Sequence, residues 1–274
     1  MNECSLQILS PRSLLLLRLT LATFCTAITI ASGVLKADPR WFIYLTNWSF
    51  LLLTVTMIGL TLVSIIREYE NISSSTENAS QEMRNCGAII TANAECASSQ
   101  NNANKVGPSP TSLTWYEKGV WILWIVSSNA ALVVTLNYWL LVFQPPTDFM
   151  DIAVHALNSF VMLVEFFMSK TPVRILHVLY VMIFAIVYSL FSVIFWAAGG
   201  VNVKVPLTQN AIFAPWKVLD YENGEPAVVS AVLLGIIFLI SPILQLTLFG
   251  LHRLKQRYLR KKRDAIYGNI NLAL

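Results

Sequence analysis

The stretch GVWILWIVSSNAALVVTLNYWLLVF, residues 119–143, contains 25 residues and no charged side chain. A helix of this length, at about 1.5 Å per residue, is long enough to cross the hydrocarbon core of a bilayer, which is about 30 Å thick. Five further stretches are nearly as apolar, and they lack the alternating pattern of barrel strands. They cover residues 13–35, 41–66, 149–168, 172–198 and 226–251. The sequence therefore predicts an all-α fold, a six-helix transmembrane bundle.

The composition of the whole chain also indicates a membrane protein. Of its 274 residues, 55% are hydrophobic and 12% are charged, whereas a soluble domain carries about 25% charged residues. This composition excludes an ordinary soluble enzyme, a disordered tail and a nucleic-acid-binding domain. The partner that it predicts is the lipid bilayer, of either the plasma membrane or the endoplasmic reticulum.

Six spans place both ends of the chain on one side of the membrane, and the basic residues indicate which side. The N-terminal segment, residues 67–118, residues 169–174 and the tail hold 14 Lys and Arg, and the connections on the opposite side hold 4. Because Lys and Arg concentrate in cytosolic loops, we expect both termini in the cytosol. The tail contains HRLKQRYLRKKR, which is expected to hold the last helix against anionic lipid.

The composition also divides the chain into four parts. These are residues 1–66 with the first two spans, the polar residues 67–118, residues 119–251 with the other four spans, and the basic tail 252–274. Residues 71–112 are rich in Ser and Asn, so we expect 67–118 to form a disordered cytosolic loop without a packed core. The glycosylation sequons at Asn71 and Asn78 would then stay unmodified.

On the outer side, the longest connection covers residues 199–225. It begins with Gly199-Gly200 and passes through APWKVLDYENGEP. Its aromatic residues and prolines are compatible with an ordered cap on the membrane face, and a plain connecting loop is the favoured interpretation. The four cysteines of the chain are too few and too scattered for a disulfide framework or a zinc site. No metal or other cofactor is predicted.

Three ionisable side chains, Arg18, Glu165 and His177, lie at a similar depth near the cytosolic side of the predicted spans, and Arg174 lies close to the start of the fifth span. Ionisable groups within a span need a partner or a function because their burial in lipid is costly. We expect a structural cluster in which Glu165 pairs with Arg18 or Arg174, and His177 forms a hydrogen bond nearby.

A second polar group is predicted near the outer side. Thr46 and His155 lie at the same depth in two spans that run in the same direction, with Asn47 beside the threonine and Asn158 three residues after the histidine. A hydroxyl and an imidazole at one level are the minimum for nucleophilic acyl transfer. An amide can orient these groups or stabilise the oxyanion. The alternative is that both residues only pack between helices.

Four segments, taken in their order and spacing, resemble the rolling stone family of invertebrate membrane proteins. They are WFIYLTNW at 41–48, HALNSFVMLVEFFMSKTPVRILHVLY at 155–180, VYSLFSVIFWAAGG at 187–200 and PWKVLDY at 215–221. The resemblance covers most of the membrane part and none of residues 71–112. It implies a multipass membrane protein associated with myoblast fusion, of obscure biochemical activity.

The architecture is also similar to that of the androgen-induced membrane hydrolases, which cleave fatty-acid esters of hydroxy fatty acids. In that family a threonine follows Tyr-Leu in the second span, as Thr46 follows Tyr44-Leu45 here, and a histidine opens the fourth span, as His155 does. This similarity implies Thr46 as the nucleophile and His155 as the general base.

Two functional hypotheses follow. In the first, the chain is an intramembrane lipid-ester hydrolase that uses Thr46 and His155, with Asn47 and Asn158 as orienting or oxyanion-binding groups. In the second, it is a non-enzymatic component of cell adhesion or myoblast fusion that acts through contacts with membrane proteins, and residues 199–225 give these contacts their specificity.

Overall fold

The structure is a computed structural model, and it describes residues 9–35, 39–92, 113–142, 149–198 and 226–272. In these ranges the chain is helical almost throughout and contains no strand. Six stretches are long and apolar enough to cross a membrane, so the prediction of an all-α six-helix bundle is confirmed. These stretches are Pro11–Val34, Leu45–Glu77, Trp115–Leu140, Phe149–Met168, Ile175–Phe195 and Ala231–Ala265.

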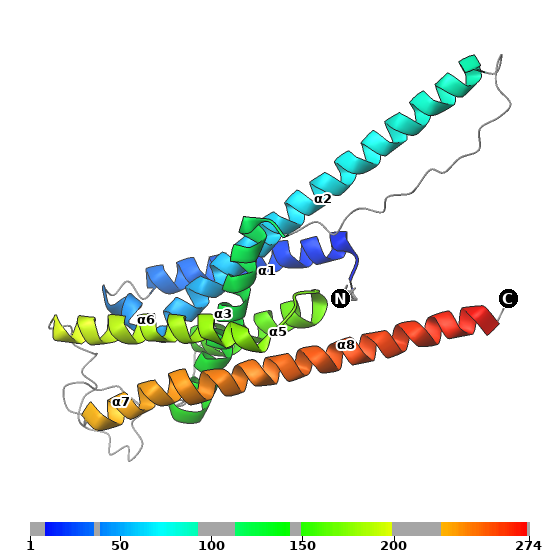
Figure 1. Ribbon diagram of the computed structural model, residues 1–274. Helices are drawn as coiled ribbons and strands as arrows, with labels where there is room; N and C mark the ends of the chain where they lie inside the picture. The colour runs from blue at the N-terminus through cyan, green and yellow to red at the C-terminus, as the bar shows by residue number, and fades with distance from the viewer. Residues whose placement is uncertain (1–8, 36–38, 93–112, 143–148, 199–225, 273–274) are drawn as a thin grey trace.

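Long helices alternate with short helical segments. The long helices are α1 (Pro11–Leu35), α2 (Leu45–Ala92), α3 (Trp115–Asn137), α5 (Asn158–Met168), α6 (Val178–Ala197) and α8 (Ser241–Leu272). The short segments are η1 (Pro39–Ile43), η2 (Tyr138–Val142), α4 (Phe149–Ile152), η3 (Ala153–Leu157), η4 (Ile175–His177), α7 (Pro226–Gly235) and η6 (Ile236–Ile240). Figure 1 shows that α1 begins and α8 ends at the same end of the bundle.

Helix α3 lies at the centre of the bundle, where it contacts α2, α5, α6 and α8. Every side chain from Trp124 to Ala131 is buried, and the Trp124 ring stacks on Phe166 of α5 with 8° between the ring planes. The approach to α2 is close at Gly59, where an added Cβ would lie 3.0 Å from the Val120 side chain. Small residues at such crossings let membrane helices pack tightly.

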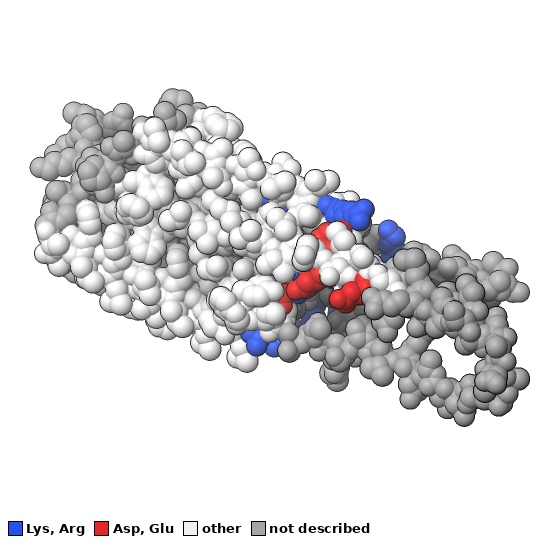
Figure 2. Space-filling model, turned by 90° about the horizontal axis from the view of Figure 1, so that it is seen from above, with Lys and Arg blue, Asp and Glu red and all other residues white. Residues whose placement is uncertain are grey.

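The outside of the bundle is apolar. Large hydrophobic side chains such as Leu16, Ile183 and Phe238 are more than half exposed. In the view of Figure 2, the charged side chains gather toward one end of an otherwise uncharged body. A surface of this kind is stable in lipid, and its extent far exceeds the apolar patches that soluble monomers expose. The bundle is therefore built for the membrane.

Three wide, π-helical turns interrupt the helices at η2, η3 and η6. The reason is clearest at η6, which immediately precedes Ser241-Pro242. Proline lacks an amide hydrogen, and its ring clashes with the carbonyl group four residues earlier. The Ser241 hydroxyl donates a hydrogen bond to the Ile236 carbonyl at 2.8 Å, and this bond satisfies part of the interrupted backbone.

Part of the segment in which a disordered loop was expected, from Arg67 to Ala92, is helical. Helix α2 continues without interruption to Ala92 and projects far beyond the bundle (Figure 1). The sequence contains neither Gly nor Pro between residues 60 and 86. The hydroxyls in the projecting part also donate to carbonyl groups four residues earlier, as Ser74 does to Glu70 at 2.8 Å. The rest of the predicted loop, 93–112, and the outer connection 199–225 lie outside the described residues.

Candidate functional site

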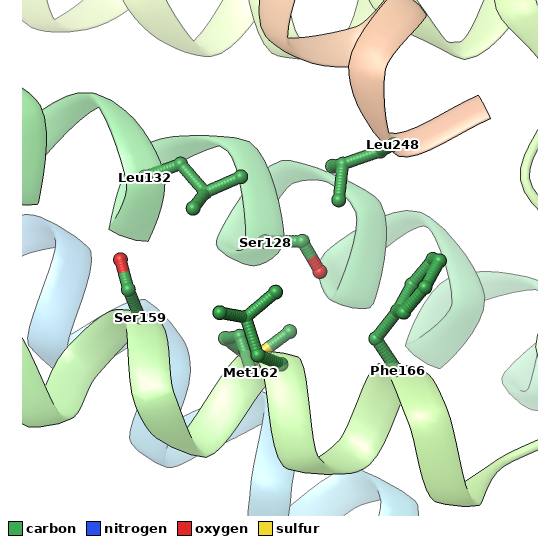
Figure 3. A pocket seen from close by; sticks show the side chains of 7 residues that line it. Ser128, Leu132, Ser159, Met162, Phe166 and Leu248 are labelled. Atoms are coloured by element: carbon green, nitrogen blue, oxygen red, sulfur yellow. The ribbon is translucent and has the colours of Figure 1, made fainter. Parts of the chain in front are cut away.

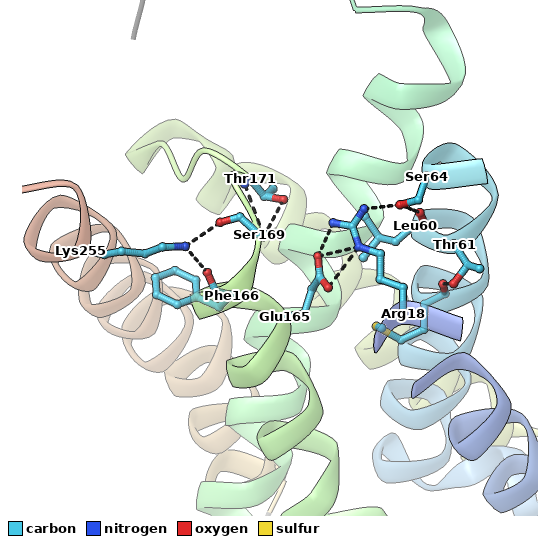
Figure 4. A network of polar contacts seen from close by, with 10 residues as sticks. Arg18, Leu60, Thr61, Ser64, Glu165, Phe166, Ser169, Thr171 and Lys255 are labelled. Carbon is cyan, nitrogen blue, oxygen red and sulfur yellow. Dashed lines mark hydrogen bonds and ion pairs between the residues drawn. The ribbon is translucent and has the colours of Figure 1, made fainter. Parts of the chain in front are cut away.

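Among the polar contacts inside the described part of the bundle, two groups lie near opposite ends. The inner group centres on Arg18 of α1 and Glu165 of α5, which are both buried (Figure 4). The Arg18 Nε lies 3.2 Å from each carboxylate oxygen of Glu165. The Arg18 Nη1 donates to the Ser64 hydroxyl of α2 at 2.6 Å. The ion pair thus joins α1 to α5, and the hydrogen bond to Ser64 adds α2.

The two charges of this pair compensate one another within the inner group. Two opposite charges in a site shielded from water neutralise one another, whereas removing one of them leaves an uncompensated buried charge. The guanidinium fork also matches a carboxylate in geometry. The arrangement is typical of a buried ion pair that holds neighbouring helices together. It offers no free nucleophile, because Ser64 itself donates to the Leu60 carbonyl at 2.9 Å.

A second set of bonds ties α8 to the end of α5. The Lys255 Nζ donates to the Phe166 and Ser169 carbonyls at 2.7 and 2.6 Å (Figure 4). Nearer the start of α8, the Gln245 side chain donates to the Arg174 carbonyl at 2.7 Å. Lys255 belongs to the basic tail that was expected to lie against anionic lipid, whereas its side chain is buried and donates to the last carbonyls of α5.

Arg174 and His177 belong to a different contact. The Arg174 guanidinium lies 5.6 Å from the centre of the Trp121 ring. The His177 ring meets the same indole edge to face, with 4.7 Å between ring centres. Of the four residues predicted to cluster, the structure therefore pairs Arg18 with Glu165 and places the other two around Trp121 of α3.

Two further ion pairs mark the rim of the bundle beyond the buried group. Arg12 of α1 pairs with Glu68 of α2 at 2.9 Å. Arg67 of α2 pairs with Glu117 of α3 at 2.6 Å. Both pairs are partly exposed, as expected where helices leave the lipid. These pairs were not predicted from the sequence, because a charge at the end of a span carries no signal of its partner.

The outer group centres on His155, which lies in the π-helical turn η3. Its ring stacks on Tyr138 of η2, with ring centres 3.6 Å apart and planes within 4°. Its carbonyl group accepts a hydrogen bond from the Thr135 hydroxyl of α3. The Thr135 hydroxyl also lies 2.7 Å from that of Ser159. The histidine is thus held against α3 and its π-helical extension.

The other residues of the predicted acyl-transfer site have separate contacts. Thr46 is half-buried in the first turn of α2. The Asn47 amide donates to the Trp41 carbonyl of η1 at 2.6 Å. The fully buried Asn158 amide donates to the Ser49 hydroxyl of α2 at 3.0 Å. Ser49 was missed, although it follows Thr46 by three residues and so lies on the same side of the helix.

Two hollows lie beside these groups. One is a narrow space between α3, α5 and α8, lined by apolar side chains together with Ser128 and Ser159 (Figure 3). The other is a groove of about 530 Å³ between α1 and α2. Within the described ranges, no three His, Cys, Asp or Glu side chains come together as metal ligands would.

Six apolar helices locked by buried polar contacts define the class of this protein, a multipass α-helical membrane protein. The family model described as protein rolling stone matches residues 98–268, and the chain belongs to this family. The chain is similar to the protein rolling stone of Drosophila melanogaster, with 28% identity over 252 residues, which is 90% of this chain and 79% of that protein. No solved structure matches the chain.

Proposed function

We propose that this protein acts without catalysis, as a membrane-embedded component of cell adhesion or cell fusion that works through protein contacts. The observation that carries the proposal is that the polar side chains at the outer end of the bundle contact neighbouring helical segments. His155, Asn47 and Asn158 each form a contact that holds one helical segment against another. The rolling stone family, which the sequence resembles, is associated with myoblast fusion, and this association supports the non-catalytic function.

Acyl transfer and helix packing require different contacts of these side chains. A nucleophile and its base lie within hydrogen-bond reach, about 2.6–3.2 Å, and a third group orients the base. Here the ring of His155 stacks on Tyr138, and the amide of Asn158 is directed to Ser49. The Asn47 amide donates a hydrogen bond to the Trp41 carbonyl. Each of these contacts stabilises helix packing.

A cell-mixing experiment tests the proposal. Two populations of non-adherent cells, labelled with different cytosolic dyes, express the chain at matched surface levels. We expect cell aggregation or dye mixing above the vector control, and we expect Thr46→Ala and His155→Gln to retain it. Replacement of residues 199–225 by a Gly/Ser linker of equal length should remove it. Activity at the vector level, or its loss in Thr46→Ala, would contradict the proposal.

A second candidate function is the hydrolysis of a lipid ester. It is favoured by the position of His155 in one π-helical turn stacked against another, because such turns are frequent at functional sites. In this reaction the Thr46 hydroxyl would attack the ester carbonyl while His155 takes its proton. The proton then passes to the leaving alcohol, and water releases the fatty acid from Thr46.

Labelling with a fluorophosphonate probe separates the two functions. The probe is applied to solubilised membranes that contain wild type, Thr46→Ala or His155→Ala at matched expression. Hydrolysis predicts labelling of the wild type that both substitutions remove. Equal labelling of all three proteins, or none where a control hydrolase reacts, supports the non-catalytic function.

A further inference from the structure

Helix α2 carries a continuous stripe of exposed apolar side chains. Its members follow one another at alternating spacings of four and three residues, and each is at least 38% exposed. They are Leu51, Val55, Ile58, Leu62, Ile65, Tyr69 and Ile72. This spacing is the heptad repeat of coiled coils, in which every such side chain packs against a partner helix.

The opposite side of the helix faces its own bundle. Phe50, Leu53, Met57 and Leu60 are buried. In heptad terms these residues occupy positions c and f, whereas the stripe occupies a and d. Further along, Arg67 is also at position f and pairs with Glu117 of α3. The bundle therefore uses one face of α2 and leaves the stripe facing outward.

Lipid can cover only part of this stripe. Leu51 to Ile65 lie within the span predicted from the sequence, residues 41–66. Tyr69 and Ile72 lie beyond the ion pair of Arg12 with Glu68, which marks the rim. Tyr69 is 74% exposed and Ile72 is 52% exposed. Beyond them, the helical sequence continues the same spacing with Thr76, Ala79, Met83, Cys86 and Ile90.

The projecting helix also needs support from outside. Ser, Thr and Asn make up nine of residues 67–92, and these residues have low helix propensity. Isolated helices of modest length are only marginally stable in water, and most helices in proteins depend on packing of an apolar face. A partner helix along the stripe would supply that packing.

We propose that two copies of this chain associate through α2, so that the stripes form a parallel two-stranded coiled coil that continues from the membrane into the projecting helix. The second copy is the occupant because its α2 carries the matching heptads. It also spans the membrane in the same direction, so the two helices are necessarily parallel and can lie in register.

The charges in the projecting helix are compatible with this pairing. In a parallel coiled coil, position g of one helix faces position e of the next heptad on the other. Glu68 and Glu82 are the charged residues at position g, and they would face Ser73 and Gly87 of the second copy. No like charges oppose one another in this alignment.

The groove between α1 and α2 favours the same partner. It has a volume of about 530 Å³, and stripe residues Ile58, Leu62 and Ile65 line one side of it. The α1 side carries the small residues Ala22, Thr23, Thr26 and Ala27. Small side chains let a neighbouring membrane helix approach closely, so the groove can receive large stripe residues of the second copy.

Disulfide crosslinking tests the proposal at Cys86. A variant that keeps Cys86 and lacks Cys4, Cys25 and Cys96 is oxidised in native membranes and run on a non-reducing gel. A parallel, in-register coiled coil places the two Cys86 side chains opposite one another at position d, where a disulfide can form. We expect a crosslinked dimer that reductant removes.

Moving the cysteine provides the matched control. In a cysteine-free background, Met83→Cys and Ile90→Cys at position a should form the crosslinked dimer. Gln81→Cys and Ala88→Cys at position f should not form it. Equal crosslinking at all positions would indicate random collision and overturn the proposal. Adducts of a mass other than the dimer, or monomer at every position, would overturn it as well.

A second measurement does not depend on cysteine chemistry. Two differently tagged copies are expressed together, solubilised in a mild detergent and co-purified. Ile72→Glu should remove the co-purification, whereas Ser74→Glu, which adds the same charge at the exposed position f, should keep it. Both variants should be expressed at the wild-type level, and Ile72→Glu should elute as a single, non-aggregated monomer. Equal co-purification of both variants would show that the stripe is not the interface.

Discussion

At the scale of single residues, the Arg18–Glu165 pair is the interaction on which the inner half of the bundle depends. Its two side chains come from α1 and α5, and both are buried. The Ser64 hydroxyl of α2 accepts a further bond from Arg18. Such a pair adds specificity because a charge left unpaired within the membrane is costly.

We therefore expect Glu165→Gln to destabilise the protein by about 3–5 kcal/mol, because the Arg18 charge would stay buried without its counter-ion. The measurement is the unfolding equilibrium of the purified protein in mixed micelles. The double variant Arg18→Met, Glu165→Leu should recover most of the loss, because it removes both charges together.

The exposed pair at the rim is the matched control. Arg12 is 78% exposed where it meets Glu68, so water and salt screen the pair. We expect Arg12→Gln to change the free energy of unfolding by at most about 1 kcal/mol. A loss as large as that of Glu165→Gln would show that position within the bundle does not govern the strength of these pairs.

At the scale of helices, α8 holds the end of α5 through one buried lysine. The Lys255 Nζ satisfies the Phe166 and Ser169 carbonyls, and it lies 5.5 Å from the centre of the Phe166 ring. A helix end leaves its last carbonyl groups unpaired unless a side chain reaches them. The lysine therefore joins two helices that are distant in the sequence.

Lys255→Met should destabilise the protein by about 1–3 kcal/mol, because the substitution leaves buried carbonyl groups without a donor. The readout is the midpoint of thermal unfolding in detergent. Lys261→Met, at an exposed position of the same helix, should leave the midpoint unchanged. Equal shifts for the two variants would mean that the tail acts through its charge and not through this contact.

At the scale of the whole molecule, the side on which the α2 projection lies follows from the distribution of basic residues. The chain ends and residues 67–118 share the side with 14 Lys and Arg. Because basic loops stay in the cytosol, the sequons at Asn71 and Asn78 should carry no glycan. Their part of α2 is helical and projects from the bundle (Figure 1).

One substitution tests this orientation from the other side. Lys204→Ser converts residues 202–204 into the sequon Asn-Val-Ser. We expect the variant to gain one glycan that an endoglycosidase removes, as seen by a mobility shift on a gel, whereas the wild type shows no shift. A shift of the wild type that depends on Asn71 or Asn78 would reverse the orientation.

The six spans could be predicted from the sequence because crossing lipid depends on a local property, the length and apolarity of one stretch. The same holds for the level at which Arg18 and Glu165 meet, since depth follows from position along each span. The continuation of α2 was missed for a related reason. Its apolar residues, such as Tyr69 and Ile72, are isolated among Ser and Asn, so the composition indicated a loop while the spacing favoured a helix.

The choice among partners required the tertiary structure. Glu165 pairs with Arg18, which lies 147 residues away in the sequence, and not with the nearer Arg174, because α1 packs beside α5 while Arg174 turns toward Trp121 of α3. His155 likewise contacts Tyr138. Depth along a span is a property of one helix, but the direction in which a side chain points depends on how each helix rotates against its neighbours.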